Sequence, residues 1–329
     1  MTATKSASPS TSTTAPSCGR SRSPSPTTRT SAKSGIRPAG LKAAETSARR
    51  GHRVILLERN RALGGQLLYA EKQPEHQNVT EVTSYLEIVA AELGVDIRRG
   101  LEGTTDAIHA LAPDIVIVAT GSEPNLPRVS NADSAQSLAL GRHVLPEVEG
   151  LDRDFVVSSD DVLSGRVVCS GRVVVADNNG HWEAAGTAEF VADNGCDVTV
   201  VAPHAVGSDL EAGSRTLFYR RAAIKGIKLR SGVSLVSVGD RSVIVSPVFS
   251  GNDAIGWAKY LLMPGDEETI EDVDWLVAVI GRRSREDLFL KLKADPRFAS
   301  VRVERIGDCV APRMIESNIA EAFILARDL

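Results

Sequence analysis

The sequence contains no C-x-x-C pair, no long apolar run and no excess of positive charge. Its four cysteines stand far apart from one another, so neither a zinc site nor an iron–sulfur cluster is expected in this chain, and we assign no metal ligand. A disulfide framework is not expected in a chain of 329 residues either, which makes the reducing cytoplasm the expected compartment. No apolar stretch approaches the ~18 residues of a membrane span, and the net charge of −4 argues against a nucleic-acid or anionic-membrane partner.

Acidic residues are missing from the start of the chain. No Asp or Glu precedes Glu45, and 20 of the first 30 residues are Ser, Thr or Pro. Such a segment cannot bury enough apolar surface to offset its chain entropy. We therefore expect residues 1–33 to form a disordered, low-complexity tail. Two explanations of this tail stay open: an organellar transit peptide, or an unrelated start on a truncated coding region.

From Gly35 onward, apolar runs alternate with helical stripes. Continuous apolar runs such as Val54–Leu57, Ile115–Val118 and Leu276–Ile280 are typical of parallel strands that are covered on both faces. Apolar residues spaced by three and four between Val79 and Leu93 indicate an amphipathic helix that Gly94 ends. The pattern restarts after residue 165. It predicts an α/β protein with two Rossmann-like, FAD/NAD(P)-binding-type domains and mainly parallel sheets.

The segment from Gly35 to Gly40 is nearly the G-x-G-x-x-G turn that binds a dinucleotide. Gly35 and Gly40 are in place, but Arg37 occupies the position of the middle glycine, which normally lets the pyrophosphate approach the backbone. Glu58 lies 18 positions after Gly40, at the end of the next strand, where an acid accepts ribose hydroxyls. Arg59 follows it.

Three further features occur in the order that such a site requires: a glycine-rich loop after the acid, a glycine turn behind a buried strand, and Gly307-Asp308 before the last helix. Alone, each glycine is explained equally well by an ordinary turn, and Asp308 by a helix N-cap. Taken together they give the following candidate cofactor-binding residues: Gly35, Ala39, Gly40, Glu58, Arg59, Gly64, Gly65, Gln66, Ala119, Thr120, Gly121 and Asp308.

This set resembles the two-dinucleotide-domain flavoproteins. More closely, it is similar to the C-terminal half of the trimethylamine dehydrogenase and 2,4-dienoyl-CoA reductase branch of the old yellow enzyme (NADH:flavin oxidoreductase) family. The residues that carry the resemblance are Pro38-Ala39-Gly40-Leu41, Gly51 to Glu58, Leu63-Gly64-Gly65-Gln66, Ala119-Thr120-Gly121-Ser122, Val157 to Leu163 and Ile306-Gly307-Asp308. The resemblance implies that Glu58 holds the adenosine ribose of FAD or ADP. It also implies that Asp308 contacts the ribityl–pyrophosphate part of a flavin.

The catalytic half of that family is an N-terminal (β/α)₈ barrel with FMN and an iron–sulfur cluster. Such a barrel needs ~200–250 residues, whereas 34 residues precede Gly35. A dinucleotide fold also needs a buried strand directly before its first glycine. Residues 28–34 contain no large aliphatic side chain, so we expect this first strand to be missing or degraded. For that reason we favour a truncated gene start over a targeting peptide.

The second unit lacks a dinucleotide turn. Its first strand leads into Asp177 and then Glu183, which bring negative charge where a pyrophosphate would lie, and no ribose-binding acid follows the next strand. We therefore expect no tight NAD(P)H binding. His181 and Trp182 are better explained as a surface histidine and a packed aromatic than as catalytic groups. The histidines show no ligand or triad spacing, so no catalytic residue is assigned.

The sequence thus predicts three segments: a tail at 1–33, an FAD/ADP-binding-type domain at 34–150 plus 284–329, and an NAD(P)-binding-like domain at 151–283. The expected function is that of a flavin- or adenine-nucleotide-binding oxidoreductase module, the electron-transfer half of a trimethylamine dehydrogenase-like or NADH:flavin oxidoreductase-like enzyme. The expected ligand is FAD, or ADP at the same site. An electron-transfer protein or a separate barrel subunit is the expected protein partner. The alternative is a non-catalytic remnant that keeps the fold and at most binds ADP.

Overall fold

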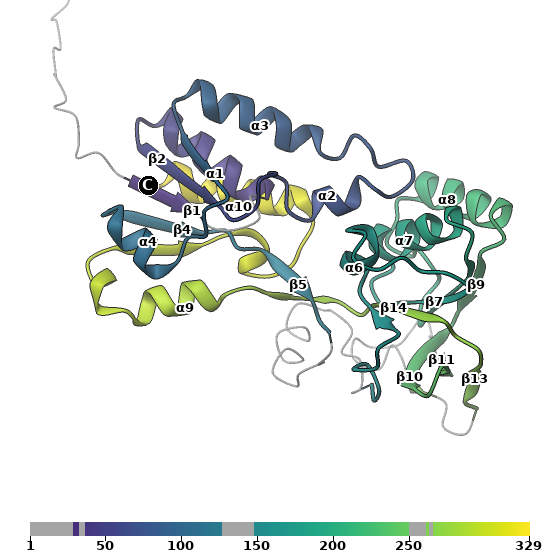
Figure 1. Ribbon diagram of the computed structural model, residues 1–329. Helices are drawn as coiled ribbons and strands as arrows, with labels where there is room; N and C mark the ends of the chain where they lie inside the picture. The colour runs from purple at the N-terminus through teal and green to yellow at the C-terminus, as the bar shows by residue number, and fades with distance from the viewer. Residues whose placement is uncertain (1–28, 33–36, 127–147, 250–260, 263–265) are drawn as a thin grey trace, which may run out of the picture.

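Two five-stranded parallel sheets form the frame of the molecule (Figure 1). The computed structural model describes residues 29–32, 37–126, 148–249, 261–262 and 266–329, of which 29–32, 249 and 261–262 are described by their backbone alone. Both faces of each sheet are covered, as expected for strands that are apolar on both sides. Helices cover both faces of the first sheet, whereas the second sheet has helices on one face and a small antiparallel sheet on the other. The protein is therefore an α/β protein with mainly parallel sheets, as the sequence predicts.

The first sheet has the strand order β16-β4-β1-β2-β3, in which the chain crosses from one half of the sheet to the other between β1 and β4. Its strands are β1 (Arg29–Ala32), β2 (Arg53–Glu58), β3 (Asp96–Arg99), β4 (Ile115–Val118) and β16 (Arg302–Arg305). All four pairings are parallel. A ligand of such a sheet binds beyond the carboxyl ends of the strands at this crossing point.

The prediction that residues 28–34 supply no central strand is wrong, whereas the rest of the predicted tail, residues 1–28 and 33, lies outside the described residues. β1 lies in the middle of the sheet, with Thr30 aligned to Val54 of β2 and to Ile115 of β4. Strand pairing uses backbone N–H and C=O groups, which every residue of this segment has, so large aliphatic side chains are not a condition for it. Because β1 is present, the argument for a truncated start that relied on its absence does not hold.

Alternate residues of β2 pack on opposite helical layers. Leu56 contacts a cluster that contains Leu41 of α1 (Pro38–Arg49) and Leu86 of α3 (Glu81–Glu92). Ile55 and Leu57 face the other cluster, to which α4 (Thr105–Ala110) and α9 (Asp287–Ala294) contribute. The C-terminal helix α10 (Ile315–Arg327) packs beside α1 (Figure 1). This double covering explains why β2 reads as an unbroken apolar run.

The second sheet repeats the arrangement of the first, with the order β6-β14-β7-β8-β9. Its strands are β6 (Val156–Val157), β7 (Arg172–Asp177), β8 (Asp197–Ala202), β9 (Lys228–Ser231) and β14 (Trp275–Val279). The helices α6 (Ser159–Leu163), α7 (Trp182–Asp193) and α8 (Ala212–Ile224) accompany it. The chain again crosses over between two central strands, β7 and β14, which agrees with two related units.

A small antiparallel sheet is inserted between β9 and β14. It consists of β10 (Val233–Val238), β11 (Val243–Phe249), β12 (Leu261–Leu262) and β13 (Glu268–Ile270). The sequence predicts one strand over Lys228–Val238, but the structure divides it at Gly232, whose φ of +77° turns the chain from the parallel sheet into the antiparallel one. A positive φ is accessible to glycine without steric cost.

Two short strands, β5 (Ser122–Pro124) and β15 (Arg282–Ser284), carry the chain between the units and pair antiparallel to each other. A four-residue helix, α2 (Leu67–Ala70), lies on the side of the first unit that faces α6 (Figure 1). Two 3₁₀ turns, η2 (Pro296–Phe298) and η3 (Gly307–Cys309), flank β16. None of the helices in the described part of the chain is long and apolar enough to cross a membrane.

Candidate functional site

A cavity of about 810 Å³ lies between the two units, at the carboxyl ends of β4, β16 and β14. Six of the predicted site residues line it: Ala39, Gly64, Gln66, Ala119, Gly121 and Asp308. A second cavity of about 370 Å³ adjoins it and is lined by Arg59, Gly65, Gln66 and Thr120, among others. Arg37 and Gln66 line both cavities.

Glu58 and Gly40 lie in neither cavity lining. Gly40 is buried in the first turn of α1, next to the cavity residue Ala39. Glu58 ends β2, is fully buried, and accepts a hydrogen bond from the backbone N–H of Asn60 at 2.6 Å. Gly35 lies outside the described residues. The structure thus gathers nine of the twelve candidates in the linings of two adjoining cavities and leaves the carboxylate of Glu58 inside the protein.

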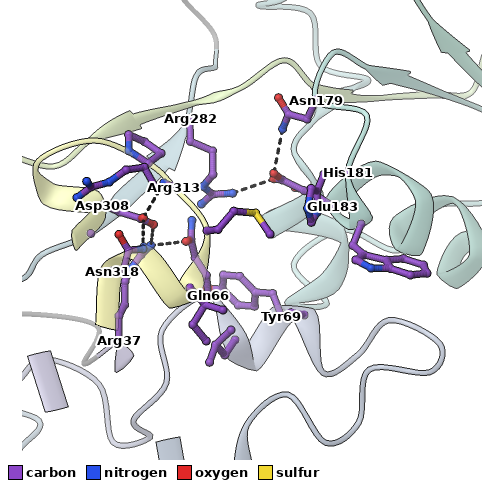
Figure 2. Close-up of a pocket in the computed structure, with 18 of the residues that line it drawn as sticks. Arg37, Gln66, Tyr69, Asn179, His181, Glu183, Arg282, Asp308, Arg313 and Asn318 are labelled. Carbon is purple, nitrogen blue, oxygen red and sulfur yellow. Dashed lines mark hydrogen bonds and ion pairs between the residues drawn. The ribbon is translucent and has the colours of Figure 1, made fainter. Parts of the chain in front are cut away.

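Arg37 is bound on several sides at the start of α1 (Figure 2). Its Nη1 lies 2.7 Å from Oδ2 of Asp308 and also donates to the side-chain oxygen of Gln66, while Nη2 donates to the backbone carbonyl of Ser122 at 2.7 Å. The side chains of Arg37 and Asp308 are only 13% and 8% exposed. The residue that replaces the middle glycine is therefore a fixed, buried cation at the centre of the site.

The glycine turn behind β4 accommodates this arginine. Gly121 has a φ of +73°, and a Cβ atom placed on it would lie 2.0 Å from Nε of Arg37. The side chain of Arg37 thus fills the hollow that the absence of a Cβ atom creates. Nε itself is buried and has no hydrogen-bond partner among the described residues.

Asp308 is surrounded by donors. Its Oδ1 accepts from the amide of Asn318 at 2.7 Å and from the backbone N–H of Arg313 at 3.2 Å, and its Oδ2 accepts from Arg37 and from Ser122 Oγ. It belongs to η3, and the N-cap of α10 is Met314, so Asp308 is not the cap of the closing helix. Both of its carboxylate oxygens are engaged by protein groups.

The positive charge of Arg37 is balanced by the carboxylate of Asp308. Burial lowers the pKa of Arg37 to about 10, although the neighbouring carboxylate of Asp308 opposes the shift. Arg37 therefore stays protonated at neutral pH. A buried guanidinium that retains its charge is stable only beside its carboxylate partner. Arg37 and Asp308 therefore each stabilise the buried charge of the other.

Two residues that were not predicted, Ser122 and Arg282, connect the two units. Ser122 Oγ lies 3.3 Å from Nε of Arg282, which in turn binds Glu183 through Nη1 at 2.9 Å (Figure 2). Burial lowers the pKa of Arg282, but the charges and hydrogen bonds of Glu183 and Asp160 outweigh it and the net pKa is raised. Both residues could have been found by comparing the two units. Each directly follows a glycine that comes shortly after a buried central strand, β4 in the first unit and β14 in the second.

In the second unit, the turn that follows the first central strand β7 is occupied by the side chain of Asp177. Oδ1 of Asp177 accepts the backbone N–H groups of Asn179 and Gly180 at 2.9 and 2.8 Å. These are amides of the turn that, in a dinucleotide site, would face a pyrophosphate. Burial raises the pKa of Asp177, and nearby His204 offsets the shift only in part.

Trp182 and His181 both line the larger cavity, and His181 is half-buried rather than a surface histidine. Trp182 packs against the core of the second unit and meets His76 edge-on, with ring centroids 4.5 Å apart. His181 is the N-cap residue of α7 and makes no side-chain capping hydrogen bond. The described residues include no group of three potential metal ligands.

Sheet order, crossing points and glycine turns define the class: an α/β oxidoreductase fold built from two dinucleotide-binding-type units. Residues 35–304 match the pyridine nucleotide-disulphide oxidoreductase family, and the chain belongs to that family.

Its relatives are longer oxidoreductases. The chain is 32% identical to an NADH oxidase of Thermoanaerobacter brockii over 74% of this chain and 36% of that protein. It is 29% identical to an N,N-dimethylglycine/sarcosine dehydrogenase of Chromohalobacter salexigens over 88% of this chain and 42% of that protein. The chain therefore spans well under half of the length of these curated relatives. The solved histamine dehydrogenase of Rhizobium sp. 4-9 shares the fold, with a TM-score of 0.77 at 21% identity over 93% of this chain and 42% of that one.

Proposed function

We propose that this chain is the adenine-nucleotide-binding module of an oxidoreductase, the electron-transfer half of a trimethylamine dehydrogenase-like or NADH:flavin oxidoreductase-like enzyme. The observation that carries the proposal is the convergence of Ala39, Gln66, Gly121 and Asp308 on one cavity at the crossing point of a parallel sheet. Ligands of doubly wound sheets bind there.

In this proposal the nucleotide unit consists of β1, residues 34–150 and residues 284–329, and the second unit of residues 151–283. The return of the chain to the first sheet through β16 supports this division. The adenosine ribose would lie near Glu58, and the diphosphate near the amides that follow Gly64. The names of the relatives, which include dehydrogenases of methylated amines, favour amine oxidation as the activity of the complete enzyme.

The test is a calorimetric titration of the purified chain with ADP and, separately, with FAD. The expected result is saturable binding of ADP at one site per chain. Absence of saturable binding by both nucleotides would overturn the proposal.

A second candidate, the non-catalytic remnant, is favoured by the position of Arg37 in the glycine hollow of the first site. The two candidates differ in redox chemistry, since the module needs a flavin on this chain or on a copurifying barrel subunit. A chain that binds ADP but purifies from its native source without flavin absorption, alone or in complex, supports the remnant. A flavin that can be reduced and reoxidised in the purified sample supports the module.

A further inference from the structure

We propose that Arg37 closes the flavin-side half of the first nucleotide site, so that this chain accepts an adenosine diphosphate nucleotide and excludes FAD. The inference rests on the proposed function, because it names which member of the ligand class the site takes. It assigns Arg37 as the residue that determines this specificity.

The strand order fixes the path that a dinucleotide would follow. Glu58 ends β2 and Asp308 follows β16, and these strands are separated by β1 and β4. Three strand spacings of about 4.8 Å put roughly 14 Å between the two strand ends. A ligand that starts with its adenosine at β2 must pass the start of α1 and the Gly121 turn before it reaches Asp308. Arg37 lies on that path.

The contacts of Arg37 show that its side chain fills the space between the start of α1, the Gly121 turn and Asp308. The guanidinium is bound by Asp308, Gln66 and the carbonyl of Ser122, and its Nε sits 2.0 Å from where a Gly121 Cβ would be. No atom of a ligand fits between these groups. FAD on this path would therefore have to displace the side chain of Arg37.

Asp308 adds a second obstacle for a flavin. A ribityl chain presents hydroxyl groups, which need acceptors, and the carboxylate of Asp308 already accepts from Arg37, Ser122, Asn318 and the Arg313 amide. A flavin would have to separate the buried Arg37–Asp308 pair before it could bond to Asp308. The loss of one partner from a buried ion pair corresponds to a change of about 100-fold or more in an equilibrium constant.

Arg37 favours the binding of a nucleotide that ends at its diphosphate. Arg37 is a cation at the start of α1, where anions are favoured. A terminal phosphate therefore gains a charged neighbour, and it has no ribityl chain that must pass beyond it. The same arginine thus favours the shorter nucleotide and opposes the longer one.

The experiment measures ADP binding by calorimetry and FAD binding by quenching of flavin fluorescence. The proteins are the full-length wild type, Arg37→Gly and Arg37→Ser. Gly and Ser are both good N-cap residues, and circular dichroism reports whether each variant is folded. Arg302→Ala is the matched control, because it removes an exposed arginine from the opposite end of β16, where the partner is Glu304.

The wild type is expected to bind ADP at least about 100-fold more tightly than FAD. The Arg37 variants are expected to gain FAD affinity by a similar factor, and Arg302→Ala to behave as the wild type. Equal wild-type affinities for FAD and ADP would overturn the inference, whether or not the variants fold. So would folded Arg37 variants that bind ADP but gain no affinity for FAD. Failure of every folded protein to bind either nucleotide is a different pattern, and it would overturn the proposed function together with the inference.

Discussion

Arg282 on β15 forms a two-point ion pair with Asp160 on α6: Nη1 lies 3.0 Å from Oδ1, and Nη2 lies 2.8 Å from Oδ2. The same Nη1 lies 2.9 Å from a carboxylate oxygen of Glu183 on α7. β15 belongs to the pair of strands that joins the two units, so these contacts attach the connection to the second unit. Parallel N–H···O pairs of this kind add geometric specificity as well as energy.

Arg282→Ala should destabilise the protein by about 2–4 kcal/mol, somewhat below the range for the loss of one partner in a fully buried pair. The reason is that Asp160 and Glu183, which are 15% and 25% exposed, would face each other without their shared cation. Urea unfolding measures the change. Arg302→Ala, which breaks an exposed pair, should cost less than about 1 kcal/mol, and an equal loss in both variants would contradict this role of Arg282.

Glu58→Ala should weaken ADP binding by ~1.5–3 kcal/mol, the usual loss when a charged hydrogen-bond partner is removed. Glu58 stands at the end of β2, where an acid can accept both ribose hydroxyls. Its carboxylate is fully buried and accepts the N–H of Asn60, so the expected loss requires that ADP binding exposes it. Calorimetry measures the affinity, with exposed Glu81 on α3 changed to alanine as the control. Unchanged ADP affinity in folded Glu58→Ala would mean that the nucleotide binds elsewhere.

NADH and NADPH should not bind tightly to the second unit. The carboxylate of Asp177 already accepts the amides of Asn179 and Gly180, and a pyrophosphate placed there would meet its charge. Two like charges 4 Å apart repel by about 4 kcal/mol at a surface-like dielectric, enough to abolish micromolar binding. Nicotinamide fluorescence measures the binding, and saturation at low micromolar concentration by either nucleotide would contradict the prediction.

Most of the parallel framework could be predicted from local pattern. β2, β4 and β14 are buried on both faces and α3 on one, so their sequences carry the periods that such burial requires. β1 could not be predicted in this way, because its place in the sheet depends on backbone pairing with β2 and β4 and not on its own side chains. The break at Gly232 was missed for a related reason: two apolar strands with a glycine between them also match one longer strand.

The candidate site, too, could be predicted from local sequence patterns only in part. The glycines and Asp308 could be found from their order along the chain, since each follows or precedes a recognisable strand. The role of Arg37 could not be predicted, because its partner Asp308 is 271 positions away and Ser122 is 85 positions away. From the sequence Arg37 is only a residue that breaks a motif, whereas in the fold it is the residue that fills the glycine hollow.

Asp177→Asn should make stability less dependent on pH. Because burial raises the pKa of Asp177, the folded protein holds this proton more tightly than the unfolded chain does. Its contribution is therefore fully present below the ordinary pKa of 3.8 and is lost as the pH rises through the folded-state value. Asparagine keeps the acceptor for the two turn amides without the charge. Urea unfolding between pH 4 and pH 7 should show the wild type losing stability relative to Asp177→Asn. A constant difference, or one of the opposite sign, would mean that His204 and Glu183, the neighbouring titratable groups, set the dependence.

Gly121→Ala should destabilise the protein by about 2–4 kcal/mol. A positive φ alone costs a non-glycine residue about 1–2 kcal/mol, and the new methyl group would also overlap Nε of Arg37 at 2.0 Å. In an Arg37→Gly background only the backbone part should remain, so the two changes should couple by about 1–2 kcal/mol in a double-mutant cycle. Gly51→Ala supplies the matched control, because Gly51 has a φ of +87° and a Cβ atom added to it would meet no atom within 4 Å. Its loss should be the backbone part alone, in either background. If Gly121→Ala costs the same with and without Arg37, the arginine does not fill the glycine hollow in solution.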